Sequence, residues 1–184
     1  FVENHDLPLL DISVEFSAGS SRDDKSRPGL ASMTHHLLTF GAGGMTEEEI
    51  SRRMADIGAS LGGSFDQDRA GLRLRTLSSE RERGQALEIM AKWLQSPDFP
   101  EAVLAREKPR SIAELKEAMT QPEFIAGRAV NSMVYGTHPY ALSSTVEPES
   151  IAALRREELV GFYRTHYRAD HAVIALIGDV TTAQ

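Results

Sequence analysis

The stretch Leu10-Asp11-Ile12-Ser13-Val14-Glu15-Phe16 decides the fold class, because apolar and polar side chains alternate along it. A period of two predicts a β-strand with one buried face and one solvated face. The polar, glycine-containing residues 19–27 that follow are typical of a loop. The sequence therefore predicts a sheet with at least this strand, and further strands have to come from other parts of the chain.

Two further stretches predict strands. Residues 60–77 are rich in glycine and then alternate between apolar side chains and arginines from Leu72 to Thr76. We interpret them as a hairpin that turns near residues 66–69. Residues 172–177 form a continuous apolar run with β-branched side chains, which predicts a central strand buried on both faces.

Apolar side chains at helical spacing fill the intervals between the strands. Ser26 and Pro28 predict the start of the first helix, and Gly41, Gly43 and Gly44 its end. Two capping-box patterns, Thr46 with Glu49 and Ser79 with Glu82, predict the next two helix starts. The apolar positions expected on these helices and on a later one are Leu30, Met33, Leu37 and Leu38; Ile50, Met54 and Ile57; Leu87, Met90, Ala91 and Leu94; and Leu159, Phe162 and Tyr163.

A long helix is expected over residues 101–119, with Pro109 inside it. An internal proline costs about 3 kcal/mol, so we expect it to kink the helix. Gln121-Pro122 interrupts the chain again, and another helix continues to Tyr135-Gly136. The order is strand, helices, hairpin, helices, strand. It favours an α+β fold with a mostly antiparallel sheet covered by helices over a doubly wound fold.

One domain over residues 1–184 is the simplest organisation. The chain opens on Phe1-Val2-Glu3-Asn4 without an initiator Met, so we expect it to be a piece of a longer protein. The formal net charge of −7 argues against non-specific nucleic-acid binding. Zero cysteine excludes a disulfide scaffold, a thiolate zinc site and a cysteine nucleophile. No apolar run approaches the roughly 20 residues that span a bilayer.

The candidate chemical groups are two histidines and two glutamates. His35 and His36 are adjacent on a predicted helix, so their rings point about 100° apart and cannot easily share one metal. Zinc-binding helices offer ligands four residues apart, and the residue four before His36 is Ser32. Glu107 and Glu114 lie two helical turns apart among other charged residues, which is typical of a solvated face. Spacing alone therefore favours structural or surface roles.

Several stretches in a fixed order nevertheless resemble the pitrilysin/insulinase family of zinc peptidases, which includes the mitochondrial processing peptidases. These stretches are Phe1-Val2-Glu3-Asn4 with Leu7-Pro8, residues 14–19 followed by Gly29-Leu30-Ala31, Gly41 with residues 46–50, Gly58-Ala59, Leu77, Ser96-Pro97, Gly136 with His138-Pro139-Tyr140, and Leu176-Ile177-Gly178-Asp179-Val180. The resemblance covers essentially the whole chain. It implies a mitochondrial processing peptidase-like metallohydrolase fold.

The family's inverted zinc motif, H-x-x-E-H, falls on Ser32-Met33-Thr34-His35-His36. The first zinc-binding histidine is replaced by Ser32 and the catalytic glutamate by His35, while His36 matches. The resemblance also implies that Glu107 corresponds to a supporting glutamate and Glu114 to the third zinc ligand. His36 and Glu114 are thus the remnant metal positions.

These substitutions predict a chain without catalytic residues, bound metal or cofactor, although active relatives use zinc. A catalytic zinc needs three protein ligands plus water, and only two matching ligands remain. Loss of the general base alone removes a contribution of roughly 10²–10⁴-fold to the rate. We therefore expect no peptide hydrolysis and no tight zinc binding.

The resemblance suggests three functions. The first is a non-catalytic peptidase-like domain that pairs with an active zinc peptidase domain or subunit, as in a heterodimer, to enclose a chamber for unfolded peptide. A sheet edge could hold an extended peptide by strand addition. The second is an active metallopeptidase in which His35, His36, Glu107 and Glu114 hold zinc in a new arrangement. The third is a purely structural scaffold like the core subunits of respiratory complexes. The compartment stays open, with a periplasmic or otherwise exported location plausible for a bacterial relative.

Overall fold

The alternating stretch forms strand β2 (Leu9–Phe16), the middle strand of a five-stranded sheet in a computed structural model that describes residues 1–182. The last two residues of the expected 1–184 domain lie outside the described residues. The other strands are β1 (Val2–Glu3), β3 (Gly41–Ala42), β4 (Met45–Thr46), β5 (Ser60–Phe65), β6 (Ala70–Leu77) and β7 (Val173–Gly178). The helices are α1 (Leu30–Leu37), α2 (Glu47–Asp56), α3 (Glu80–Gln95), α4 (Glu101–Ala118), α5 (Pro122–Tyr135), α6 (Pro148–Ala153) and α7 (Arg156–His166), with 3-10 turns η1 (Ser20–Arg22), η2 (Pro139–Thr145) and η3 (Ala169–His171).

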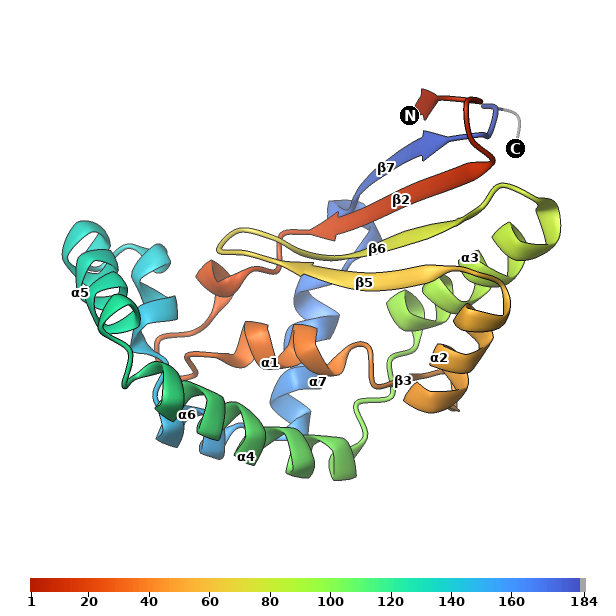
Figure 1. Ribbon diagram of the computed structural model, residues 1–184. Helices are drawn as coiled ribbons and strands as arrows, with labels where there is room; N and C mark the ends of the chain where they lie inside the picture. Colours follow the sequence, from red (N-terminus) through yellow and green to blue (C-terminus); the bar gives the residue numbers. More distant parts are fainter. Residues whose placement is uncertain (183–184) are drawn as a thin grey trace.

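The sheet has the order β1-β7-β2-β6-β5, and all its pairs are antiparallel except β1 with β7. The helices lie on one side of it, so the molecule has two layers (Figure 1). This confirms the α+β class with a mostly antiparallel sheet. No helix within residues 1–182 combines the length and apolar character needed to cross a membrane.

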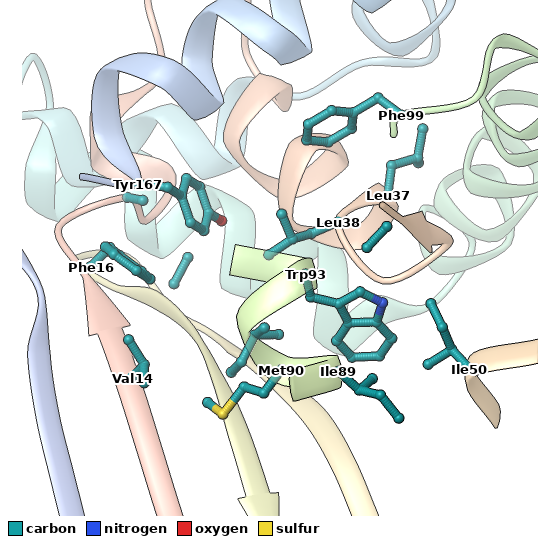
Figure 2. Close-up of a cluster of buried hydrophobic side chains, with 14 of the residues drawn as sticks. Val14, Phe16, Leu37, Leu38, Ile50, Ile89, Met90, Trp93, Phe99 and Tyr167 are labelled. Carbon is teal, nitrogen blue, oxygen red and sulfur yellow. The ribbon is translucent and has the colours of Figure 1, made fainter. Parts of the chain in front are cut away.

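The alternation in β2 matches its burial. Leu10, Ile12, Val14 and Phe16 are at most 6% exposed, because they face the helical layer. Figure 2 shows Val14 and Phe16 in a core cluster with side chains of α1, α2 and α3. The expected hairpin is also confirmed, since β5 pairs along its whole length with residues 70–75 of β6, and Asp66 and Arg69 close the turn.

The start of α1 differs from the expectation of a Ser26 cap with Pro28 in the first turn. The helix begins at Leu30, and the buried carboxylate of Asp23 accepts hydrogen bonds from the backbone N–H groups of Gly29 (2.8 Å) and Ala31 (2.6 Å). The chain thus folds back so that a loop residue six positions upstream satisfies the free amides of the first turn. Propensity near the helix start does not reveal such a remote cap.

The glycines at 41, 43 and 44 do not end α1, which stops at Leu37. They form a small hairpin instead, in which Gly41 pairs with Thr46 and Ala42 with Met45. Gly43 and Gly44, which lie between β3 and β4, have positive φ angles that suit the tight turn. The capping box of Thr46 and Glu49 then opens α2 as expected.

The second expected capping box is wrong in detail. Ser79 occupies the N-cap of α3, but its side chain caps no backbone amide and its hydroxyl bonds the Glu82 carboxylate directly. The buried face is also shifted from the expected one. It consists of Ala86, Ile89, Met90 and Trp93, whereas Leu87 is 37% exposed. The expected helix at 101–119 forms as α4 and continues through Pro109.

The prediction that residues 172–177 are buried on both faces is wrong. Strand β7 does lie inside the sheet, but Val173, Ile174 and Ile177 are at least half exposed. Among the residues that the structure describes, its neighbour on one side is the two-residue β1. The helical layer covers β2 and β6 rather than β7 (Figure 1). A continuous apolar run predicts an apolar environment, and here no part of residues 1–182 supplies it.

Candidate functional site

Helices α1 and α4 meet where the sequence predicted a degenerate site. The Nε2 atom of His36, on α1, lies 3.0 Å from Oε2 of Glu107, on α4. Met33 and Leu37 on the buried face of α1 and Leu104 on α4 anchor the two helices in the core. The structure therefore brings His36 and Glu107 together, although they are far apart in the sequence.

Ser32 and Glu114 lie in the same region. Together with His36 they line a cavity of about 390 Å³ between α1 and α4, to which Phe124 on α5 also contributes. Ser32 and Glu114 are both exposed side chains. The three positions that the resemblance relates to zinc ligands thus share one cavity.

Glu107 is a buried carboxylate, with a side chain only 1% exposed. Burial raises its pKa, but hydrogen bonds with His36 and Arg106 outweigh that effect and leave the pKa below its ordinary value. The Arg106 Nε atom lies 2.7 Å from Oε1 of Glu107. An ionised carboxylate only accepts, so Nε2 of His36 carries the hydrogen and donates it. That nitrogen then has no lone pair for a metal.

Glu114 is also paired with an arginine. The Nε atom of Arg110, one turn earlier on α4, donates to Oε1 of Glu114 over 3.0 Å. Its Nη1 atom lies 3.9 Å from Oε2 of Glu107. Arg110 therefore stands between the two glutamates that the family resemblance picks out.

His35 points away from this cavity, as its position next to His36 on the helix predicted. Its ring stacks on Phe65 at the end of β5, with centroids 5.5 Å apart, and Nδ1 lies 3.4 Å from the Tyr167 hydroxyl. Burial lowers the pKa of His35 to about 4, so the ring is neutral at neutral pH. The residue in the position of the family's general base is thus a packing residue between α1, β5 and Tyr167.

The residues present do not fit a zinc ion. Ser32 offers a hydroxyl instead of an imidazole, and Glu114 is paired with Arg110, so His36 is the one imidazole left in the implied ligand set. Within residues 1–182 no three His, Asp or Glu side chains are close enough to hold a metal. A catalytic zinc requires three such ligands and an open position for water.

Residues 3–148 match the model of the insulinase family, peptidase family M16. The chain belongs to this family. Among solved structures, the insulinase-family chain is similar to the crystal structure of a peptidase M16 inactive domain from Pseudomonas fluorescens. The sequence identity is 34% and the TM-score 0.95, over 100% of this chain and 44% of that one.

The curated relatives of this chain are less similar in sequence. A probable mitochondrial-processing peptidase subunit beta from Arabidopsis thaliana is 24% identical over 92% of this chain and 32% of its own length. The non-peptidase homolog YmxG of Helicobacter pylori is 22% identical over 100% of this chain and 42% of its own length. This insulinase-family chain thus spans less than half the length of these relatives.

The sequence pointed to Ser32, His35, His36, Glu107 and Glu114, but not to the partners that fix them. The arginines at 106 and 110 were interpreted only as part of a charged helix face. The spacings of three and four residues between Arg110 and the two glutamates give a signal for pairing on a helix, whereas the adjacent Arg106 and Glu107 give none. Nothing in the sequence indicated the contact of His35 with Phe65 and Tyr167, because that contact depends on how β5 and the end of α7 pack against α1.

Proposed function

We propose that this chain is a non-catalytic, single peptidase-like domain of a zinc protease system, which pairs with an active domain or subunit to enclose a chamber for peptides. The observation that carries the proposal is the state of His35. The residue in the position that the resemblance implies for the general base is half-buried, neutral and stacked on Phe65. It faces away from the cavity that Ser32, His36 and Glu114 line.

The relatives support a non-catalytic function. One structure with 34% identity is described as an inactive domain of the family, and one curated relative is named a non-peptidase homolog. Mitochondrial-processing peptidase subunits beta are also among the relatives, and the word subunit in their names supports pairing. The partner of this chain is inferred to carry an intact H-x-x-E-H motif.

Strand β5 gives the domain a way to hold an extended peptide. It is the last strand of the sheet, and no strand within residues 1–182 pairs with its outer edge. Asp66 and Arg69 form a hydrogen-bonded pair at the turn. Because such pairs alternate along an antiparallel ladder, the backbone groups of Leu61, Gly63 and Phe65 point outward. An added strand would bond to these groups.

Activity and metal content test the non-catalytic part of the proposal. The purified chain is incubated with zinc, desalted and analysed for metal by mass spectrometry, and then mixed with an unstructured peptide. We expect less than 0.1 zinc per chain and no cleavage above the background rate. Stoichiometric zinc together with cleavage by this chain alone would favour a rearranged active site instead.

Pairing is tested by co-expression with a family member that carries H-x-x-E-H. We expect a complex on size exclusion, with peptidase activity that depends on both chains. The matched control is the same partner with its motif glutamate changed to glutamine, which should still form the complex but lose activity. Failure of the two chains to associate, with full activity of the partner alone, contradicts the pairing.

Peptide binding at β5 is tested with two N-methylated forms of one peptide. N-methylation removes backbone donors, and in a strand only alternate residues face the neighbouring strand. One form is methylated at the alternate residues whose N–H groups face β5, and the other at the residues in between. We expect the first form not to bind and the second to bind as the unmethylated peptide does. Equal loss of binding with both forms, or with neither, rules out strand addition and favours a purely structural scaffold.

A further inference from the structure

Arg110 contacts both glutamates that the family resemblance relates to the zinc site. Its guanidinium contacts Glu114 at 3.0 Å and Glu107 at 3.9 Å, so one cation reaches both glutamates of the degenerate site. Glu107 has a partner of its own in Arg106, whose Nε lies 2.7 Å away. Arg110 is therefore not needed to compensate the buried carboxylate, and its shorter contact is with Glu114.

Glu114 is the only carboxylate among the remnant metal positions. It lines the cavity with His36 and Ser32, and its Oε1 atom accepts a hydrogen bond from Arg110. A divalent cation that used Glu114 would have to displace this hydrogen bond and would lie close to the guanidinium charge. The two positive charges would repel each other at this separation. The exposure of Arg110, 68%, lets the side chain swing away and relieve part of this repulsion.

We infer that the Arg110 guanidinium takes the place of the metal's positive charge at Glu114, so that this site is closed to zinc by a built-in cation as well as by the missing ligand at Ser32. The inference concerns the electrostatics of the cavity and does not depend on whether the chain pairs with a partner. It predicts that restoring the ligand alone gives a poor metal site.

The test starts from Ser32→His, which places a second imidazole four residues before His36 on α1 and leaves His35 in place. Ser32 and Arg110 are both exposed, so these substitutions should leave the fold intact, and circular dichroism checks this. Zinc affinity is measured by competition with a chromophoric chelator. We expect S32H to bind zinc weakly and S32H/R110Q to bind at least tenfold more tightly, within the range of effects reported for groups around metal ligands.

Two controls separate the local effect from general charge. S32H/K116Q removes a cation from the same helix without touching Glu114, and S32H/R110K keeps a positive charge at position 110. Both should bind zinc as weakly as S32H. The inference is overturned if S32H and S32H/R110Q have equal affinity, if K116Q gives the same gain, or if R110K behaves like R110Q. None of these outcomes depends on the activity of the unchanged chain.

Discussion

Asp23 shows how one side chain sets the position of the helix that carries the candidate site. Its carboxylate is 7% exposed and accepts the backbone hydrogen bonds of Gly29 and Ala31 at the start of α1. Burial raises its pKa to about 6, because two hydrogen bonds offset only part of the desolvation. The cap is therefore costly to ionise.

This raised pKa gives the first prediction. Between about pH 4 and pH 6 the folded state binds a proton that the unfolded state has released, so the free energy of unfolding falls as the pH rises through this window. A shift of about two units corresponds to about 3 kcal/mol. Urea denaturation at pH 4, 5, 6 and 7 should show this fall in the unchanged chain and a flatter profile in D23N, because asparagine has no group that titrates in this range. Its single side-chain oxygen can still accept one of the two backbone hydrogen bonds. D56N, at an exposed carboxylate, is the control, and an unchanged slope in D23N contradicts the prediction.

Gly63 gives a second prediction at the residue scale. A Cβ atom there would lie 2.5 Å from Nε2 of His35, whereas one at Gly62 would meet nothing within 4 Å. We expect Gly63→Ala to displace the His35 ring and to lower the free energy of unfolding by about 1–3 kcal/mol. Gly62→Ala, on the same strand, should change it by less than about 0.5 kcal/mol. Equal effects of the two substitutions in urea denaturation would show that the His35 contact does not constrain β5.

Among single helices and strands, the predictions from sequence were correct where a local pattern is compatible with only one structure. The alternation in β2, the hairpin of β5 and β6 and the capping box at Thr46 were all confirmed. The failures have a common physical reason, which is that tertiary partners decide the outcome. Asp23 caps α1 from outside the local sequence, and β7 is exposed because the helices do not extend beneath it.

The attachment of β1 to β7 carries a prediction about pH. Nδ1 of His5 lies 2.6 Å from Oδ1 of Asp179, and this hydrogen bond raises the pKa of His5. The charged imidazole therefore stabilises the folded state below its unfolded pKa of about 6.5, and this contribution is lost as the pH rises through the higher folded value. Amide exchange at Asn4, which donates to the Gly178 carbonyl, should show falling protection over that range after correction for base catalysis.

The matched variant for this prediction is Asp179→Asn, which removes the negative charge and leaves β7 intact. It should make the protection of Asn4 low and independent of pH. A protection factor at Asn4 that stays constant with pH in the unchanged chain contradicts a role for the His5–Asp179 pair in holding β1.

For the whole molecule, the sequence predicted the class and the covered sheet, but not which part of the sheet is covered. Leu74 on β6 is 1% exposed, whereas Ile177 on β7 is 50% exposed. We expect Leu74→Ala to lower the free energy of unfolding by about 2–5 kcal/mol and Ile177→Thr to lower it by less than about 1 kcal/mol. Chemical denaturation measures both, and similar losses would mean that β7 is covered in solution, for example by a second copy.

For the candidate site, the sequence indicated the positions of the residues but not their contacts. The resemblance picked out the positions of Ser32, His35, His36, Glu107 and Glu114, and the structure gathers all of them on α1 and α4. The ion pairs of Arg106 and Arg110 were not foreseen, because a charged helix face has many possible pairings and only the placement of α4 beside α1 selects among them.

The position of β2 in the sheet also has a consequence for how the chain folds as it is synthesised. Ser13 pairs on one side with Arg73 of β6 and on the other with Ala175 of β7. The first pairing becomes available once β6, which ends at Leu77, has emerged from the ribosome, whereas the second has to wait for β7, which ends at Gly178. Until then one edge of an apolar strand is open to pairing with other chains. The last strand of the domain thus ends an interval in which nascent β2 is prone to aggregate, and slow translation over the helices between β6 and β7 would prolong that interval.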